Sequence, residues 1–223
     1  MTDYTLPMMG LDADQDVTPY LSAMKAGGLS FFMGYLKILT KPMVAAAHAQ
    51  GFCVGLIFEG QADNALKGAT QGKIDGQRAL DQATTLGVPA NNTIAIYAAI
   101  DKSVTKIDLP VLEDYFAAFD AEIFGKLVQG GYADGTAADD LRAHGLPDEW
   151  LPGAMGWSGS KAFLTHETPA LIQGPTIDGG EWPTGSTLTS LKLPKSLMWP
   201  KLNFQYDPDL CLVPPSQAGL WLP

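Results

Sequence analysis

Short apolar runs alternate with helix-like stretches along most of this 223-residue chain. Eight runs predict strands, at residues 7–11, 29–36, 52–58, 93–100, 127–132, 151–157, 170–174 and 203–207. The stretches between them predict helices at residues 18–26, 41–50, 75–86, 109–124, 137–144 and 161–166. Strands and helices that alternate through short links favour parallel strands with right-handed crossovers. Eight repeats favour closure into a single α/β domain, a (β/α)8 TIM-type barrel.

Two segments depart from this alternation. Residues 174–200 are rich in Gly, Pro, Ser and Thr and lack periodicity, so they predict a long excursion between strands seven and eight, a hairpin over the barrel mouth. Residues 210–223 predict an extended C-terminal tail that wraps the outside of the barrel. The whole chain, 1–223, is therefore expected to be one domain with its core at about 8–209.

An open doubly wound sheet is the alternative fold for alternating strands and helices. That fold predicts a Gly-rich phosphate-binding loop after the first strand. Here the loop instead carries three acidic residues, Asp12, Asp14 and Asp16, which would repel phosphate. We reject a nucleotide-binding fold for that reason.

Composition and charge narrow the partners. The apolar fraction of 46% supports a sizeable core, and the net charge of −10 makes nucleic acid a poor partner but leaves a polysaccharide open. Two cysteines, Cys53 and Cys211, and three scattered histidines show no zinc-ligand spacing, so we expect neither a metal nor a cofactor. A bridge between the two cysteines stays open, and Cys53 is expected to be buried.

The ends of the chain and its apolar windows bear on location. Residues 1–10 show no secretory signal, and no window has the length of a membrane span. We therefore expect a monomer without a membrane partner. It would start in the cytoplasm or be cut from a longer precursor.

The predicted strand ends gather polar and aromatic residues. In a barrel, residues just past each strand face one rim, where active sites lie. That rim would collect Asp12, Asp14, Asp16, Glu59, Gln61, Asp101, Tyr132, Asp134, Trp157, Gln173, and Asp207 or Asp209. Carboxylates, amides and aromatic rings are typical of a carbohydrate site, since rings stack on sugars and carboxylates accept from hydroxyls.

Three of these acids are the catalytic candidates. Glycoside hydrolysis needs a proton donor and a carboxylate that faces the developing positive charge. Glu59 is the expected donor, because it follows an apolar strand and precedes Gly60. Asp101 would lie beside it around the barrel as base, nucleophile or stabiliser, and Asp12 completes the group. Gln61, Tyr132, Asp134, Trp157, Gln173 and Asp207 are the expected substrate-binding residues.

Structural interpretations of the same residues remain open. A carboxylate at a strand end is often a helix cap or a loop ion pair. Asp101 could pair with Lys102 or Lys106, and Asp12 could cap the helix that begins near Thr18. Trp157 alone indicates packing more than a platform, and Gln173 in an apolar strand needs buried partners. Asp75 and Asp81 are expected on a solvated helix face.

The motifs resemble a known family. Gly72-x-x-Asp75-Gly76 through Pro89, followed by residues 93–101, is similar to the glycoside-hydrolase-like barrel catalogued as domain of unknown function 1906. Further matches, in chain order, are Gly10-Leu-Asp12, Phe58-Glu59-Gly60-Gln61, Gly130-Gly-Tyr132-Ala-Asp134-Gly135, Met155-Gly-Trp157-Ser, Leu171-Ile-Gln173 and Phe204-Gln-Tyr-Asp207-Pro-Asp209. The resemblance covers most of residues 8–209. It implies kinship with family-25 lysozymes, which are N-acetylmuramidases, and cell-wall glycan as the substrate class. It also implies a place in an actinobacterial wall protein or in a phage endolysin, which a holin or another export route would release to the cell wall.

One position departs from that pattern. Family-25 lysozymes carry Asp-x-Glu after strand four, and this Glu is their proton donor. Here the sequence is Asp101-Lys102-Ser103, so that Glu is missing. Three hypotheses follow: a peptidoglycan hydrolase with Glu59 as the acid, a silent glycan-binding module, or a structural barrel that neither binds nor cuts glycan.

Overall fold

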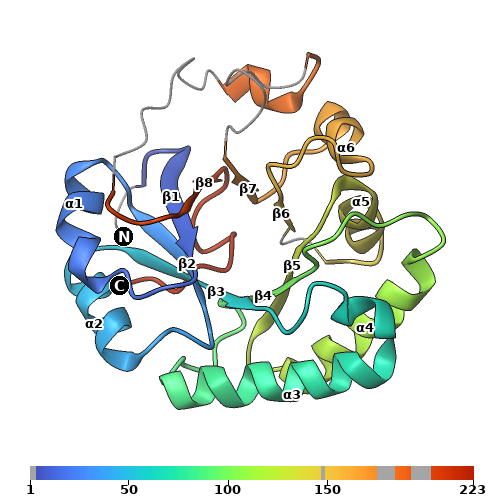
Figure 1. Cartoon of the computed structure of the whole chain (residues 1–223), viewed down its shortest axis with the longest axis horizontal. Helices are drawn as coiled ribbons and strands as arrows, with labels where there is room; N and C mark the ends of the chain where they lie inside the picture. The colour runs from blue at the N-terminus through green and yellow to red at the C-terminus, as the bar shows by residue number, and fades with distance from the viewer. Residues whose placement is uncertain (1–3, 147–148, 175–183, 192–201) are drawn as a thin grey trace.

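Eight strands close into one barrel, in the order β1 to β8, and the helices surround it (Figure 1). The structure is a computed structural model that describes residues 4–146, 149–174, 184–191 and 202–223. The α/β barrel predicted from the alternating pattern is confirmed. The strands are β1 Met8–Ala13, β2 Phe31–Tyr35, β3 Cys53–Phe58, β4 Ala95–Ala99, β5 Val128–Tyr132, β6 Glu149–Leu151, β7 Leu171–Gln173 and β8 Asp207–Cys211.

The helices follow the strands in chain order. The α-helices are α1 Leu21–Ala26, α2 Lys41–Ala49, α3 Ala69–Leu86, α4 Leu109–Ile123, α5 Gly135–Ala143 and α6 Ser160–His166. Three short 3-10 helices add η1 Thr18–Tyr20, η2 Asn64–Lys67 and η3 Thr187–Leu191. No helix among the described residues is long and apolar enough to cross a membrane.

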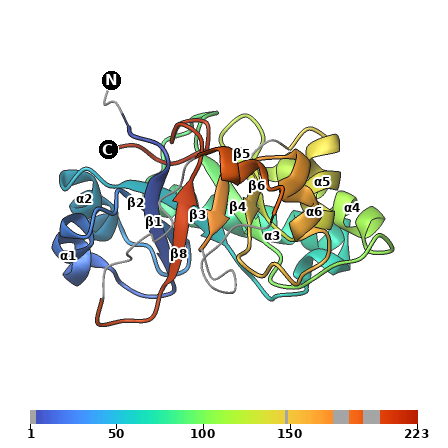
Figure 2. The same cartoon turned by 90° about the horizontal axis from the view of Figure 1, so that it is seen from above.

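β8 corrects the expectation of an all-parallel barrel. β1 to β7 pair in parallel, whereas β8 is antiparallel to both β1 and β7, as Figure 2 shows beside β1. β7 ends at the mouth, where its last residue, Gln173, lies opposite Asp209. The chain enters β8 from that same end, and two strands joined at one end run antiparallel. Of the predicted mouth hairpin, residues 175–183 and 192–201 lie outside the described residues.

β6 and β8 also differ from their predicted positions. The sixth strand was expected at residues 151–157 but is Glu149–Leu151, so Trp157 lies in the loop before α6. The eighth was expected at 203–207 but is Asp207–Cys211, so the predicted boundary between core and tail at 209 falls inside a strand. Both strands include charged residues, so a search for apolar runs does not find where they begin and end.

The core has two layers because most strands are buried on both faces, as expected of a parallel sheet. The outer layer, between the barrel and the helices, consists of a large cluster that includes Leu11 and Phe32 and a smaller one that includes Phe163 of α6. The other, including Phe31, Tyr97 and Trp150, fills the barrel itself. Large and small residues alternate in this interior: a Cβ on Gly130 would lie 2.8 Å from the Tyr97 ring.

α3 packs closely against α4 rather than against the sheet alone. It begins six residues before the predicted start, and a Cβ on Gly76 would lie 2.7 Å from the Phe119 carbonyl oxygen of α4. Asp75 is fully buried at this contact, not on a solvated face as expected. Its carboxylate accepts from Asn64, Gln71 and Tyr115 at 2.9–3.1 Å, which makes burial of the charge tolerable.

The C-terminal tail closes the bottom of the barrel instead of wrapping its outside. Trp221 forms an antiparallel bridge with Val54, near the start of β3, and Gly219 O accepts from Ala95 N at 2.8 Å. Ala218 and Leu220 are buried in the interior cluster, and Tyr97 Oη donates to Ala218 O at 2.8 Å. Figure 2 shows the tail crossing the end of the barrel opposite the mouth. The apolar tail residues explain this position, since they fill an otherwise open barrel end.

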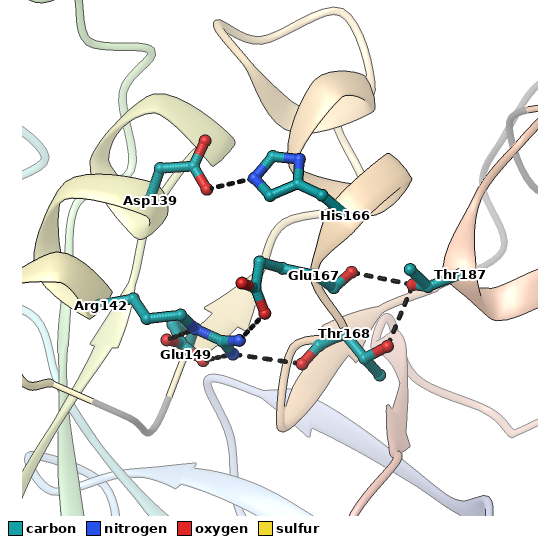
Figure 3. A network of polar contacts seen from close by, with 7 residues as sticks. All are labelled: Asp139, Arg142, Glu149, His166, Glu167, Thr168 and Thr187. Atoms are coloured by element: carbon teal, nitrogen blue, oxygen red, sulfur yellow. Dashed lines mark hydrogen bonds and ion pairs between the residues drawn. The ribbon is translucent and has the colours of Figure 1, made fainter.

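A polar network joins α5, β6 and η3 beside the barrel (Figure 3). Arg142 of α5 donates to both carboxylate oxygens of Glu149 on β6, at 2.6 and 2.7 Å, and also contacts Glu167. Thr187 of η3 donates to Glu167 O at 2.8 Å and accepts from Thr168 Oγ1 at 3.0 Å. The network attaches the described part of the excursion to the end of α6.

Candidate functional site

A pocket of about 270 Å³ opens at the mouth, where the parallel strands end. Its lining residues are Tyr35, Ile57, Glu59, Ala99, Asp101, Tyr132, Trp150, Ala154, Trp157, Gln173 and Asp207. Six of the nine predicted site residues lie here: Glu59, Asp101, Tyr132, Trp157, Gln173 and Asp207. These six residues from different strand ends therefore share one cavity.

Strand register explains why these side chains converge. Tyr132, the last residue of β5, lies opposite Ala99 on β4 and Trp150 on β6. Alternate residues of a strand share one face, so the residue two positions after Ala99, Asp101, continues the inward row. Asp101 is exposed at the mouth and makes no ion pair with Lys102 or Lys106 in the described part of the chain.

A hydrogen-bond chain runs from the pocket wall into the barrel. Tyr132 Oη donates to Gln173 Oε1 at 3.0 Å, and Gln173 Nε2 donates to Asp12 Oδ2 at 2.9 Å. Asp12 is only 4% exposed, so it lies behind the lining residues rather than at the surface. The buried partners predicted for Gln173 are thus Tyr132 and Asp12, and Gln173 orients both.

Asp209 lies next to Asp12 as a second, fully buried carboxyl group. Its Oδ1 accepts from Trp150 Nε1 at 3.0 Å, and within the described residues its Oδ2 has no hydrogen-bond partner. Burial raises the pKa of Asp12 to about 7, and burial together with the charge of Asp12 raises the pKa of Asp209 well above its usual value. The pair therefore retains a proton near neutral pH. A protonated Asp209 Oδ2 can donate to Asp12, which satisfies the otherwise unpartnered oxygen.

Asp207 is the acid of β8 that reaches the pocket. It lies directly opposite Asp12 in the antiparallel pair and is exposed to solvent. Partial burial of its carboxyl group, and then the charge of Asp101, raise its pKa. A raised pKa is the property that a proton donor needs.

Two aromatic residues of the pocket escaped the sequence analysis. Tyr35 ends β2, and burial with the nearby charges of Asp12 and Glu59 raises its pKa, so its hydroxyl stays a donor. Trp150 was missed because strand six was predicted to begin one residue later. The run Glu149-Trp150-Leu151 could have revealed it, had the glutamate been interpreted as the buried partner of Arg142.

Comparison with known proteins assigns the chain to a family. A family model described as "Rv2525c-like, glycoside hydrolase-like domain" matches residues 17–176. The chain belongs to this family. The resemblance to a glycoside-hydrolase-like barrel, inferred from the motifs, is thereby confirmed. Among curated proteins no match was found.

Solved structures share the fold of this Rv2525c-like chain. The Tat-secreted protein Rv2525c of Mycobacterium tuberculosis, solved in complex with HEPES and with L-tartrate, is 20% identical with a TM-score of 0.71 in both forms. The match covers 97% of this chain and 100% of that one. An uncharacterized protein of B. stearothermophilus is 16% identical, with a TM-score of 0.60 over 96% of this chain and 100% of its own. At such low identity these structures support the fold alone.

Glu59 stands between the pocket and a second hollow in this family member. The hollow, about 230 Å³, is lined by Lys37, Ile57, Phe58, Glu59, Gly60, Gln61, Asn64, Arg78 and Gln82. Lys37 Nζ lies 3.5 Å from Glu59 Oε2. Gln61 lines only the second hollow, so a ligand confined to the mouth pocket would not touch it.

Asp134 and Ser103 have structural roles near the mouth. Asp134 is fully buried and does not line the pocket, unlike the substrate-binding position predicted for it. Its carboxylate caps α5 through Ala137 N at 3.1 Å and accepts from Val104 N at 2.8 Å and Ser103 Oγ at 3.1 Å. Ser103 Oγ in turn accepts from Ser158 N at 2.9 Å. Position 103, where family-25 lysozymes have their acid, thus joins two loops.

Metal-ligating groups gather elsewhere. In the described part of the chain, one set of side chains, Glu113, Asp140 and His144, comes close enough together to hold a metal ion. It lies where α4 meets the end of α5, outside the barrel and away from the mouth pocket.

Asp16, in the loop after β1, has a local structural role. Its Oδ1 accepts from Thr18 N at 2.8 Å just before η1, the role that was considered for Asp12.

Proposed function

We propose that this chain is a glycoside hydrolase that acts on bacterial cell-wall glycan, peptidoglycan in the manner of a lysozyme. One observation carries the proposal: a mouth pocket lined by Glu59, Asp101 and Asp207 together with tyrosine and tryptophan rings. Glycoside hydrolases use carboxyl groups that face a shared cavity, and sugar rings can stack on the aromatic side chains. Membership of a glycoside hydrolase-like family supports the reaction class.

The three carboxyl groups differ in their surroundings, which suggests a division of roles. Glu59, the donor expected from sequence, has the Lys37 ammonium at 3.5 Å. Asp207 has its pKa raised by burial and by Asp101, and so it is a second candidate for the proton donor. Asp101, exposed in the same pocket, is then the candidate for the carboxylate that faces positive charge at the anomeric carbon, and Gln173 links the pocket to the buried Asp12.

A silent glycan-binding barrel is the second candidate, and one observation favours it. Ser103 replaces the acid of family-25 lysozymes, and its hydroxyl is engaged by Asp134 and Ser158. Binding of glycan in the pocket does not require an acid at position 103, whereas hydrolysis requires a proton donor. The aromatic and carboxylate lining would then serve recognition alone.

The test is release of reducing ends from several types of purified cell wall. We expect Glu59→Gln or Asp207→Asn, whichever removes the true donor, to slow release about 100-fold or more. Wall pull-down should survive in the same variant, because an amide keeps the shape of the acid. Asp114→Asn, an exposed change on α4, is the matched control.

The outcomes separate the candidates. Unchanged release in Glu59→Gln, Asp207→Asn and their combination would remove the proposed acids. Wall binding without release by the native chain would establish the silent binder. Neither binding nor release would leave only the structural barrel.

Location belongs to the same proposal. A relative with this fold is described as Tat-secreted, which supports a working place outside the cytoplasm. The expected cytoplasmic residence and holin release gain no such support. An export assay in the native host, with and without an intact Tat system, tests this point.

A further inference from the structure

The mouth pocket is strongly asymmetric in charge. Three carboxyl groups line it, from Glu59, Asp101 and Asp207, and none of the described lining residues is Lys or Arg. One cation, Lys37, stands at the edge, where its Nζ lies 3.5 Å from Glu59 and 5.0 Å from the centre of the Tyr35 ring. Within the described residues, three carboxyl groups against this one ammonium leave the cavity with excess negative charge.

The buried carboxyl pair behind the wall brings no cation that would cancel this excess. Asp12 and Asp209 lie inside the barrel, and the groups that contact them, Gln173 and Trp150, are neutral. Arg78 lies in the second hollow, 3.9 Å from the Asp75 carboxylate, and Arg142 is engaged by Glu149 and Glu167 beside β6. The low-dielectric barrel wall screens the carboxylates of the mouth less than water does.

Aromatic rings complete the chemistry. Tyr35, Tyr132 and Trp157 line the same cavity as the carboxyl groups. Aromatic faces attract cations, and a carboxylate beside them adds a direct ionic partner. Rings with carboxylates therefore match a ligand that is both a sugar and a cation.

We propose that the mouth pocket selects a sugar unit that bears a free, protonated amine, a de-N-acetylated amino sugar, over its N-acetylated counterpart and over sugars that carry a carboxylate. The inference rests on the proposed function, because it assumes that glycan enters this pocket. It deepens that function by naming the unit of the wall that the pocket holds.

Calorimetric titration of the full chain tests the selection with two ligands from one preparation. A β-1,4-linked glucosamine oligomer is measured first, and the same oligomer is measured again after chemical N-acetylation. At about pH 6, where amines carry a proton, we expect the free-amine form to bind about tenfold more tightly. The difference should shrink between about 0.05 M and about 0.5 M NaCl, because salt screens exposed charges.

Charge-removing variants locate the effect. Asp101→Asn and Asp207→Asn should each cut the preference for the amine several-fold, with circular dichroism used to verify the fold. Asp114→Asn removes the same charge from an exposed position on α4 and should leave the preference unchanged. L-tartrate, with which a relative was crystallised, serves as the anionic probe and should not compete with the oligomer.

Each outcome decides the inference. Equal or tighter binding of the acetylated oligomer would overturn it while leaving the proposed glycan site intact. If Asp114→Asn lost the amine preference to the same extent, the preference would come from the acidic surface in general, and the inference would be overturned. Failure of both oligomers to bind would overturn it together with the glycan site. Amine-selective binding without release of reducing ends from walls would support the selection and remove the hydrolase.

Discussion

Asp209 is a fully buried carboxyl group whose partners are few. It accepts one hydrogen bond, from Trp150, and otherwise faces Asp12. Two carboxyl groups that share a buried site cannot both ionise cheaply, so one proton is retained between them. That proton couples the stability of the barrel to pH, since the folded chain holds it more tightly than the unfolded chain does.

The sign of this coupling gives a prediction. Because burial raises the pKa of Asp12 to about 7 in the folded chain, the stabilising proton is fully present below about 4, the usual value. It is lost as the pH rises through about 7. In Asp209→Asn, the amide can donate to Asp12 and still accept from Trp150. We expect this variant to gain about 1–2 kcal/mol of unfolding free energy over the native chain at about pH 8, less at about pH 5, and nothing below about pH 4.

Urea unfolding at several pH values measures the difference. Asp114→Asn, which removes an exposed charge, should follow the native curve within error at every pH. An Asp209→Asn curve parallel to the native one would mean that the buried pair carries no proton of its own.

At the scale of the element, apolar periodicity predicted most strands and helices, and it failed where charge enters a strand. β6 begins with Glu149, whose side chain is 2% exposed, and the strand forms because Arg142 neutralises it from α5. That partner is seven residues away and invisible to a local pattern. The direction of β8 was missed for another reason: a non-periodic excursion replaces the crossover helix that a parallel strand requires.

In the candidate site, too, a local sequence pattern could not predict contacts that depend on tertiary structure. Strand ends predicted that Glu59, Asp101 and Gln173 lie at the mouth, and all three line the pocket there, because the end of a barrel strand faces the mouth whatever surrounds it. Asp134 occupies an equivalent position and yet turns into the α5 cap. The choice between mouth and cap depends on Val104 and Ser103, which tertiary structure brings to it.

Arg142 is the test of the network that holds β6. Arg142→Met keeps the length and packing of the side chain but leaves the buried Glu149 without its cation. We expect a loss of about 3 kcal/mol in unfolding free energy, because one partner of a buried ion pair is removed. Arg142→Lys should lose less, since it keeps the charge while losing the paired contact with both carboxylate oxygens.

Denaturant unfolding of both variants checks the ranking. Glu149→Gln combined with Arg142→Met should recover part of the loss, because no charge then stays buried alone. Equal losses in the single and double variants would assign the effect to packing of Arg142 on Phe163, where the guanidinium lies 5.6 Å from the ring centre.

At the scale of the whole molecule, the two ends of the barrel have separate tasks. The mouth holds the acidic, aromatic pocket, and the bottom is closed by the last residues of the chain. Ala218 and Leu220 complete the interior cluster, and Trp221 bridges to β3 while its carbonyl group meets His48 at 3.3 Å. The tail is therefore part of the core that keeps the strands, and through them the mouth, in register.

A pair of leucines two residues apart tests this division. Leu220 is 1% exposed in the barrel interior, whereas Leu222 is 39% exposed on the same segment. Leu220→Ala should cost about 3 kcal/mol of unfolding free energy through lost burial and the cavity left behind, and Leu222→Ala less than about 1 kcal/mol. Glycan affinity, measured well below the melting temperature, should stay the same in both, since the pocket lies at the other end. If Leu220→Ala were as mild as Leu222→Ala, the tail would be a covering of the barrel and not part of its core. If it weakened glycan binding while the chain stayed folded, the two ends would be coupled through the strands.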